Sequence, residues 1–193
     1  MPKMEENEEL IEQIAAHYKA ILQLIGEDPE RDGLKKTPRR AAKALLEVTR
    51  GYKQNAADFV KSALFEYSGS KIVVVKDIEF YSLCEHHVLP FFGKVSIGYI
   101  PDGTMVGLSK LARVVEAFAR RLQVQERLTA EICDSLYANL SSKGVIVVCR
   151  AEHMCMKMRG VEKQNDSTLT MEYRGAFEDA QLRDEFLKML QMQ

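Results

Sequence analysis

The 193-residue sequence predicts an α+β fold with a mostly antiparallel sheet. Two observations lead to this class. Helical periodicity dominates residues 8–64, whereas β-branched runs begin at about Ser70. The expected elements are also grouped, in the order helices, two strands, two helices, two strands and a final helix. Such grouping favours an antiparallel sheet, because strands and helices alternate in parallel α/β proteins.

Three helices are expected in the N-terminal part. Residues 8–25 place apolar side chains at steps of three and four, which is typical of an amphipathic helix. Thr37 and Pro38 predict an N-cap and a proline at the first helical position of a second helix, which ends near Gly51. A third, short helix is expected over residues 55–64.

The expected sheet has four antiparallel strands, with two helices between the strand pairs. The strand runs are residues 72–75 continuing at 78–83, then 94–100, 145–149 and 168–173; the two helices are 109–121 and 124–140, and 179–192 forms the last helix. We therefore predict two domains, an N-terminal helical arm over residues 1–68 and a sheet-containing domain over residues 69–193.

The charge balance excludes some classes of partner. The chain carries 27 Lys and Arg against 28 Asp and Glu, a net charge of -1. This argues against a protein that coats nucleic acid or an anionic membrane through bulk charge, so any anion site must be local. No apolar run approaches the ~18 residues that a membrane span needs. With no hydrophobic signal region behind its acidic start, the chain is expected to be a cytoplasmic protein.

Two short segments carry the residues of a candidate metal site. Cys84-Glu85-His86-His87 follows the first strand, and a cysteine and a histidine three residues apart across a turn can bind one zinc ion. His153-Met154-Cys155 follows the third strand. Either segment alone also fits a buried thiol near a surface imidazole. Two of them at strand ends favour a metal.

The other cysteines are poor ligands. Cys149 precedes Cys155 by six residues, so an extended strand would separate the two sulfurs by ~20 Å. Cys133 lies among apolar helical positions and is expected to be a small buried hydrophobe. Cys84, Cys155 and one histidine remain. Three protein ligands leave a position for water, as in catalytic zinc sites, although a second histidine could close the site.

Basic residues near helix starts suggest a local anion site. Ser109 is expected to cap a helix that carries Lys110 and Arg113, where cations oppose the helix dipole unless an anion binds. Two solvated surface charges would explain the same pattern. Glu126 is favourable in a first helical turn without any function, and a carboxylate in a cleft could instead accept paired N–H donors from a guanine edge.

These segments together resemble the GTP cyclohydrolase I family. The resemblance runs from about Thr37 to the C-terminus, and the motifs stand in the family's order and spacing. They are residues 80–87 (FYSLCEHH), 107–110 (GLSK), 123–129 (QVQERLT) and 153–160 (HMCMKMRG). Residues 169–174 are bulkier and more charged than the family's usual strand, but they include no ligand position.

The resemblance implies a role for each matching residue. It implies zinc (Zn2+) held by Cys84, His87 and Cys155, with water as the fourth ligand. His86 would protonate the guanine imidazole ring, while His153 and Ser109 would act in later proton transfers around the ribose. The implied substrate contacts are Glu126 with Gln125 on the guanine edge, Lys110, Arg113 and Arg159 on the triphosphate, and Arg40 reaching the triphosphate from a neighbouring subunit.

The resemblance also implies the fold and the reaction. Family members have the tunnelling fold, in which sheets of several subunits join into a barrel, and they form homodecamers with active sites between chains. The sheet-containing domain over 69–193 would thus be a tunnelling-fold catalytic domain. The implied reaction converts GTP and water into 7,8-dihydroneopterin triphosphate and formate, the first step of pterin biosynthesis.

Two other functions fit part of the pattern. A non-catalytic, zinc-stabilised nucleotide-binding module would keep the three metal ligands but could lose His86 or His153, and the sequence has both. The nitrile reductase branch of the same architecture lacks the zinc ligands and uses its cysteine as a nucleophile. The set of Cys84, His87 and Cys155 counts against that branch.

Overall fold

The computed structural model describes residues 2–192, and the side chains of residues 7–192. Internal contacts divide the chain into two compact units, Met1–Thr49 and Arg50–Gln193. Within residues 2–192, no helix is both long and apolar enough to cross a membrane.

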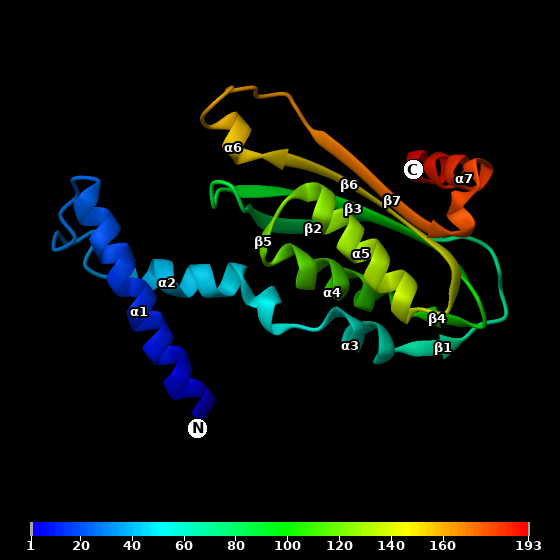
Figure 1. The fold of residues 1–193 in the computed structure, drawn as a ribbon, viewed down its shortest axis with the longest axis horizontal. Coiled ribbons are helices and arrows are strands. Elements are labelled where there is room, and N and C mark those ends of the chain that lie inside the picture. Colours follow the sequence, from blue (N-terminus) through cyan, green and yellow to red (C-terminus); the bar gives the residue numbers. More distant parts are fainter. Residues whose placement is uncertain (1, 193) are drawn as a thin grey trace. The chain divides into compact units, whose positions relative to one another are not determined.

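The first unit is a pair of helices, α1 (Pro2–Leu24) and α2 (Thr37–Val48) (Figure 1). Ile11, Ala15 and Ala42 form the buried contact between them. The predicted N-cap is wrong, because the cap residue is Lys36 and Thr37 is already helical. The Thr37 hydroxyl donates to the carbonyl of Gly33 at 3.3 Å, so it caps no N–H group of its own helix.

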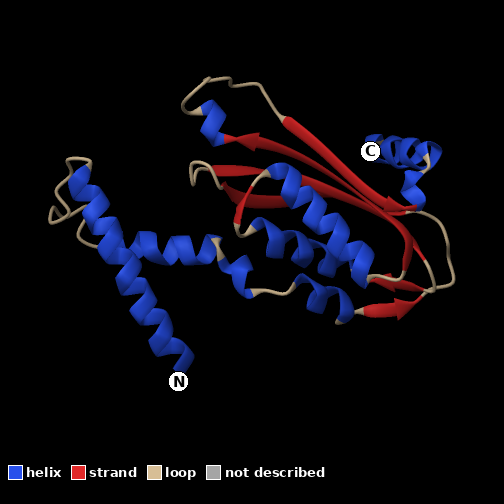
Figure 2. Ribbon diagram, viewed as in Figure 1, coloured by secondary structure: helices blue, strands red, loops and turns tan. Residues whose placement is uncertain are grey.

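The second unit contains the remaining elements. They are η1 (Arg50–Lys53), α3 (Ala56–Lys61), β1 (Leu64–Glu66), β2 (Val73–Cys84), β3 (Pro90–Pro101), β4 (Thr104–Val106), α4 (Leu108–Ala119), β5 (Leu122–Gln123), α5 (Gln125–Asn139), β6 (Ser142–His153), α6 (Met154–Lys157), β7 (Thr168–Gly175), η2 (Ala176–Glu178) and α7 (Ala180–Gln191). The predicted α+β class is confirmed (Figure 2).

The main sheet has the strand order β5-β2-β3-β6-β7. The four long strands are antiparallel, as predicted, and two-residue β5 adds a short parallel pairing to β2. The two runs expected at 72–75 and 78–83 belong to a single strand with a β-bulge between Val75 and Ile78, where Asp77 has a φ of 61°. A separate sheet pairs β1 with β4.

Apolar side chains of the central strands point alternately to the two faces of the sheet, so a core forms on each face. On β6, Val145, Val147 and Cys149 face the core beneath α3, α4 and α5, whereas Ile146 and Val148 contribute to the core around α7. This period of two is the expected result of a strand buried on both faces. Figure 1 shows α4 and α5 together on one side of the sheet and α7 on the other.

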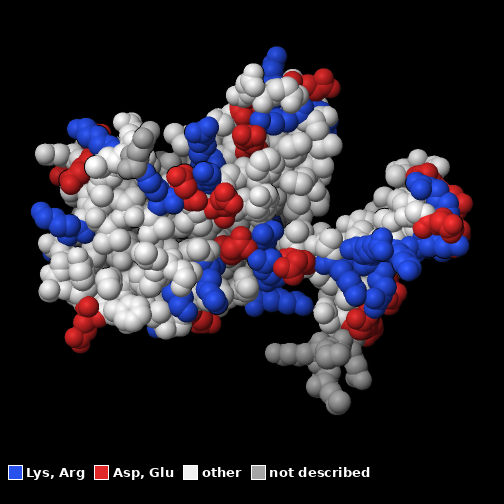
Figure 3. Space-filling model, turned by 180° about the vertical axis from the view of Figure 1, so that it is seen from behind, with Lys and Arg blue, Asp and Glu red and all other residues white. Residues whose placement is uncertain are grey.

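The strand register brings the candidate ligands to one end of the sheet. β2 ends at Cys84, β3 begins at Pro90, and Phe91 of β3 is paired with His153, the last residue of β6. Antiparallel neighbours therefore place the Cys84 turn beside the start of α6, although about seventy residues separate the two segments. On the face shown in Figure 3, cationic and anionic side chains are interspersed over this unit.

Candidate active site

A tight turn after β2 presents the first candidate ligands. The Cys84 N–H donates to the carbonyl of Leu89 at 2.8 Å, and the Val88 N–H donates back to the carbonyl of Cys84 at 2.8 Å. Val88 adopts a φ of 55°, which a β-branched residue rarely does. Such strain is often retained at functional sites, where the surrounding structure enforces it.

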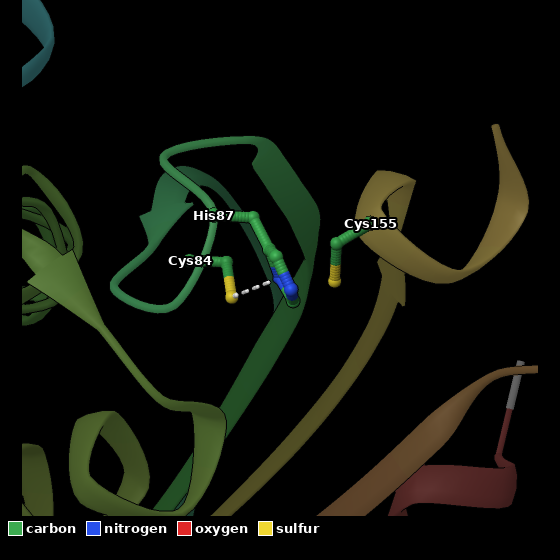
Figure 4. Close-up of side chains that lie close together, drawn as sticks. All are labelled: Cys84, His87 and Cys155. Atoms are coloured by element: carbon green, nitrogen blue, oxygen red, sulfur yellow. Dashed lines mark hydrogen bonds between the residues drawn. The ribbon is translucent and has the colours of Figure 1, made fainter. Parts of the chain in front are cut away.

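Cys84, His87 and Cys155 form a metal-ligand cluster. Their potential ligand atoms all lie within 4.8 Å of one another, and the Cys84 Sγ is 3.9 Å from the His87 Nδ1. Figure 4 shows Cys84 and His87 on the turn after β2 and the Cys155 sulfur approaching from α6. Cys84 is buried, Cys155 half-buried and His87 exposed. The cluster thus has one side open to solvent.

The electrostatics of the cluster fit a cation that accepts thiolates. Burial raises the pKa of the Cys155 thiol, and the neighbouring Cys84 raises that pKa further. Two thiolates side by side repel each other unless a cation lies between them. Two sulfurs and one imidazole nitrogen are a donor set that soft or borderline divalent metals prefer.

The remaining cysteines are placed as the sequence predicts. Cys133 and Cys149 are both fully buried, in α5 and β6, and burial raises the pKa of each thiol to about 12. Neither belongs to the ligand cluster found among the described residues. Their roles are in packing.

His86 lies beside the cluster. Its Nδ1 is 3.8 Å from the Cys84 Sγ, and its ring centroid is 6.1 Å from that of His87. The ring of His86 is exposed to solvent beside the three potential ligands.

His153 is held from two sides. Its Nε2 lies 2.9 Å from the Oε1 of Gln125, and its ring stacks on Phe91 with centroids 4.8 Å apart and planes 2° from parallel. Burial lowers the pKa of His153, while the charges of Glu126 and Asp166 act in the opposite direction. Sequence analysis missed Phe91 and Asp166, and only the register of β3 against β6 could have indicated the first of them.

The start of α4 differs from the prediction. Gly107 is the N-cap and Leu108 the first helical residue, so the expected capping role of Ser109 is wrong. Glycine is tolerated at an N-cap, and the Lys110 N–H donates to the Gly107 carbonyl at 2.8 Å. The Ser109 side chain is exposed, which leaves it free to meet a ligand.

The candidate phosphate-binding cations lie on α4, in the loop after α6 and on α2. Lys110 and Arg113 are both on α4, and the Arg113 guanidinium lies 6.0 Å from the centre of the Phe59 ring. Arg159 follows α6, close enough for its charge to lower the pKa of Cys155. Arg40 is exposed on α2 of the first unit.

The two adjacent residues at the start of α5 have opposite environments. Glu126 is exposed, whereas the Gln125 side chain is only 1% exposed. The Gln125 amide nitrogen donates inward, to the carbonyls of Cys149 and Thr168, both at 3.0 Å. A pattern of residue types could not distinguish these two positions.

An ion pair that sequence analysis missed ties the metal-ligand turn to α5. Arg127 donates to Glu85 at 2.5 Å, and this bond holds the pKa of the Glu85 carboxyl below its usual range. The Glu85 N–H also donates to the carbonyl of Gln123 at 3.0 Å. The two partners are 42 residues apart, so no local pattern could have paired them.

The fold and the site define an α+β protein with a group of side chains that could hold a metal ion. Three protein ligands converge at one end of an antiparallel sheet, and two further histidines flank them.

The chain belongs to the GTP cyclohydrolase I family, whose sequence model matches residues 14–191. A GTP cyclohydrolase 1 of Porphyromonas gingivalis is 53% identical over 185 residues, which cover 96% of each chain. One of Chlorobium phaeovibrioides is 54% identical over 183 residues, 94% of this chain and 82% of that protein. A third, of Campylobacter jejuni, is 53% identical over 173 residues, 89% of this chain and 91% of that protein.

Among solved structures, the archaeosine synthase QueF-Like in its apo form gives a TM-score of 0.46 at 19% identity. The match covers 57% of this chain and 98% of that one. The family membership rests on the sequence model of the family and on the sequence relatives.

Proposed function

We propose that this protein converts GTP and water into 7,8-dihydroneopterin triphosphate and formate, the first step of pterin biosynthesis. The observation that carries the proposal is the cluster of Cys84, His87 and Cys155 beside His86 and His153, in a chain that belongs to the GTP cyclohydrolase I family.

Zinc is the metal that we propose for the cluster, because two thiolates and an imidazole are a typical zinc donor set. A zinc ion bound there would bring the pKa of a water molecule close to neutral and so supply a nucleophile for the guanine ring. The rest of the chemistry falls to side chains of the chain itself.

His86 and His153 are the proposed proton-transfer residues. The exposed ring of His86 would protonate an imidazole nitrogen of guanine, which makes the neighbouring carbon easier to attack. His153 would serve the later proton transfers around the ribose, together with the exposed hydroxyl of Ser109. Partial burial favours the neutral form of His153, as a residue that accepts a proton requires.

Substrate recognition is proposed to divide between base and triphosphate. The exposed Glu126 carboxylate would accept the paired N–H donors of the guanine edge, with Gln125 supporting it from the same helical turn. Lys110, Arg113 and Arg159 would bind the triphosphate, and Arg40 would reach it from a neighbouring subunit. This division is typical of nucleotide sites, where cations bind phosphate and fixed acceptors select the base.

We further propose a cytoplasmic homo-oligomer, a decamer with active sites between subunits. The open edges of the sheet support this assembly, because β7 has no partner on its outer side among the described residues, and β2 has only the two-residue β5. Neither nucleic acid nor a membrane is a proposed partner.

The decisive experiment follows formate and the pterin product together during GTP turnover. Purified protein is assayed before metal removal, after removal and after zinc is restored. We expect both products to disappear with the metal and to return with zinc. Formate without pterin would confine the activity to ring opening. No reaction at one zinc ion per chain would contradict the proposal and favour a non-catalytic nucleotide-binding module.

A further inference from the structure

We propose that Gln125 is a positioning residue that holds His153 in the tautomer protonated at Nε2, so that its bare Nδ1 is the nitrogen available to substrate. This inference rests on the proposed function, in which His153 transfers protons. It assigns Gln125 a role through His153, in place of the support at the guanine edge given to it above.

The orientation of the Gln125 amide is fixed by its neighbours. Its nitrogen lies 3.0 Å from the carbonyl oxygens of Cys149 and Thr168 and 3.2 Å from the Thr170 hydroxyl. Carbonyl oxygens can only accept hydrogen bonds, so the NH2 end of the amide must face β6 and β7. The opposite end, Oε1, therefore points at His153.

The orientation of the amide decides the proton on His153. The Gln125 Oε1 is 2.9 Å from the His153 Nε2, and an amide oxygen can only accept. The hydrogen of this bond must therefore come from Nε2. A neutral imidazole carries one N–H, which leaves Nδ1 with a lone pair.

Two threonines extend this hydrogen-bond network. Thr129 donates to the backbone carbonyl of Gln125 at 2.8 Å, and its oxygen lies 2.6 Å from that of Thr170. Because the Thr129 hydrogen points to that carbonyl, Thr170 donates to Thr129. The Thr170 oxygen then accepts from the Gln125 amide, which shares its two hydrogens among three acceptors. Gln125 and Thr129 are 1% and 0% exposed, so water cannot easily replace these partners.

The ring plane of His153 is fixed as well. Phe91 is fully buried and stacks parallel to the imidazole, with centroids 4.8 Å apart. A ring flip would keep the stacking but would move Nε2 away from Gln125. The hydrogen bond and the stacking together therefore select one orientation and one tautomer.

The direct test is the 15N spectrum of the zinc-loaded protein labelled at histidine, at a pH where His153 is neutral. The His153 signals are identified by their loss in His153→Asn. We expect a protonated Nε2 and an unprotonated Nδ1. A proton on Nδ1 would overturn the inference. This measurement does not depend on GTP turnover. A protein that turns over GTP but has the proton on Nδ1 would contradict this inference alone, whereas a protein without GTP turnover would contradict the proposed function.

A matched pair of variants tests the positioning role. Gln125→Met removes the acceptor for His153. Gln123→Met makes the same change at a second glutamine, also 1% exposed, whose amide nitrogen donates to the Phe118 carbonyl and to Glu131 and whose Oε1 accepts from Arg127. Arg127 keeps its bonds to Glu85 and to the Leu122 carbonyl in that control. We expect Gln125→Met to lower kcat by about 10- to 100-fold, with KM for GTP within about twofold and the zinc content unchanged. Gln123→Met should keep kcat within about twofold of wild type.

Equal losses of kcat in the two variants would show a general packing effect and overturn the positioning role. A rise in KM for GTP at unchanged kcat would restore the direct contact between Gln125 and guanine. The 15N measurement on the wild-type protein decides the tautomer even where Gln125→Met fails to fold.

Discussion

The four cysteines show how surroundings separate identical side chains. Cys133 and Cys149 are sealed in the core, where burial raises the pKa of each thiol to about 12, so both stay protonated at neutral pH. Cys84 and Cys155 meet at the open end of the sheet, next to His87. Only this second pair has both the geometry and the access that a metal ion requires.

Replacing Cys155 with serine should remove the bound metal and GTP turnover together, because an alcohol is a far poorer zinc ligand than a thiolate. Metal per chain by elemental analysis and formate release are the measurements. Cys133→Ser is the control, since its hydroxyl can still donate to the carbonyl of Val145, the present partner of the thiol. A Cys155→Ser protein with full metal and full rate would exclude Cys155 from the site.

Lys110→Ala should weaken binding of GTP by about 10-fold, the size expected for one charge-assisted contact to phosphate. Binding of guanosine should change little, because it carries no phosphate. Calorimetric titration of both ligands gives the comparison, with exposed Lys188 on α7 replaced by alanine as the control. Equal losses for GTP and guanosine would place Lys110 away from the triphosphate.

At the scale of elements, the long strands and helices could be predicted because their patterns repeat over several turns or alternations. Strands β1, β4 and β5 could not, since two or three residues carry no periodicity. The starts of α2 and α4 differ from the prediction because Lys36 and Gly107 cap their helices without a side-chain hydrogen bond. Neither residue therefore uses the side-chain hydrogen bond by which an N-cap is usually recognised in a sequence.

In the candidate site, too, the features within short segments could be predicted and the long-range contacts could not. Cys84, Cys155 and one histidine could be proposed as metal ligands from the sequence, because the two segments that contain them follow recognisable strands. The choice of His87 over His86 came from the family resemblance. The network of Gln125 with Thr170, and the pair of Glu85 with Arg127, depend on which segments meet in three dimensions. No spacing of residues in the sequence predicts these long-range contacts.

Gly93→Ala should destabilise the sheet at the site end. A Cβ at Gly93 of β3 would lie 2.0 Å from the Arg150 carbonyl oxygen and 2.7 Å from the Ala151 Cα. These are backbone atoms of β6, so the two strands must separate, at a cost of about 1–3 kcal/mol or more. The separation of β3 from β6 should also disturb the nearby stacking of Phe91 on His153 and so reduce GTP turnover.

Gly103→Ala is the control for that substitution. Gly103 has a φ of 81°, and a Cβ added there would have no other atom within 4 Å. Alanine at this position therefore meets backbone strain of about 1 kcal/mol and no clash. Thermal unfolding of both variants gives the comparison. A Gly93→Ala protein as stable as Gly103→Ala would show that β3 and β6 can separate freely.

At the scale of the whole molecule, the sheet of the second unit is incomplete on both sides. Most of β2 and the whole outer side of β7 lack a strand partner among the described residues. Leu169 and Met171 of β7 are 66% and 39% exposed. Edges of this length favour pairing with another chain, and joining β2 of one chain to β7 of the next would close a ring.

A ring with shared active sites makes a quantitative prediction about mixed assemblies. His153→Ala chains should be inactive, and Arg40→Ala chains should turn over GTP slowly when the GTP concentration is low. If His153 of one chain works with Arg40 of its neighbour, mixing the two variants creates sites that have both residues intact. Random mixing at equal amounts completes about one site in four, so activity should recover to about a quarter of wild type.

Co-expression of the two variants with different affinity tags, purification through both tags and native mass spectrometry establish that the assemblies are mixed. Initial rates of formate release at low GTP then give the recovery. If each chain supplied both residues of its own site, no mixed assembly would contain a complete site. Activity would then stay at the average of the two parent variants, and the shared active site would be excluded even where the oligomer itself is confirmed.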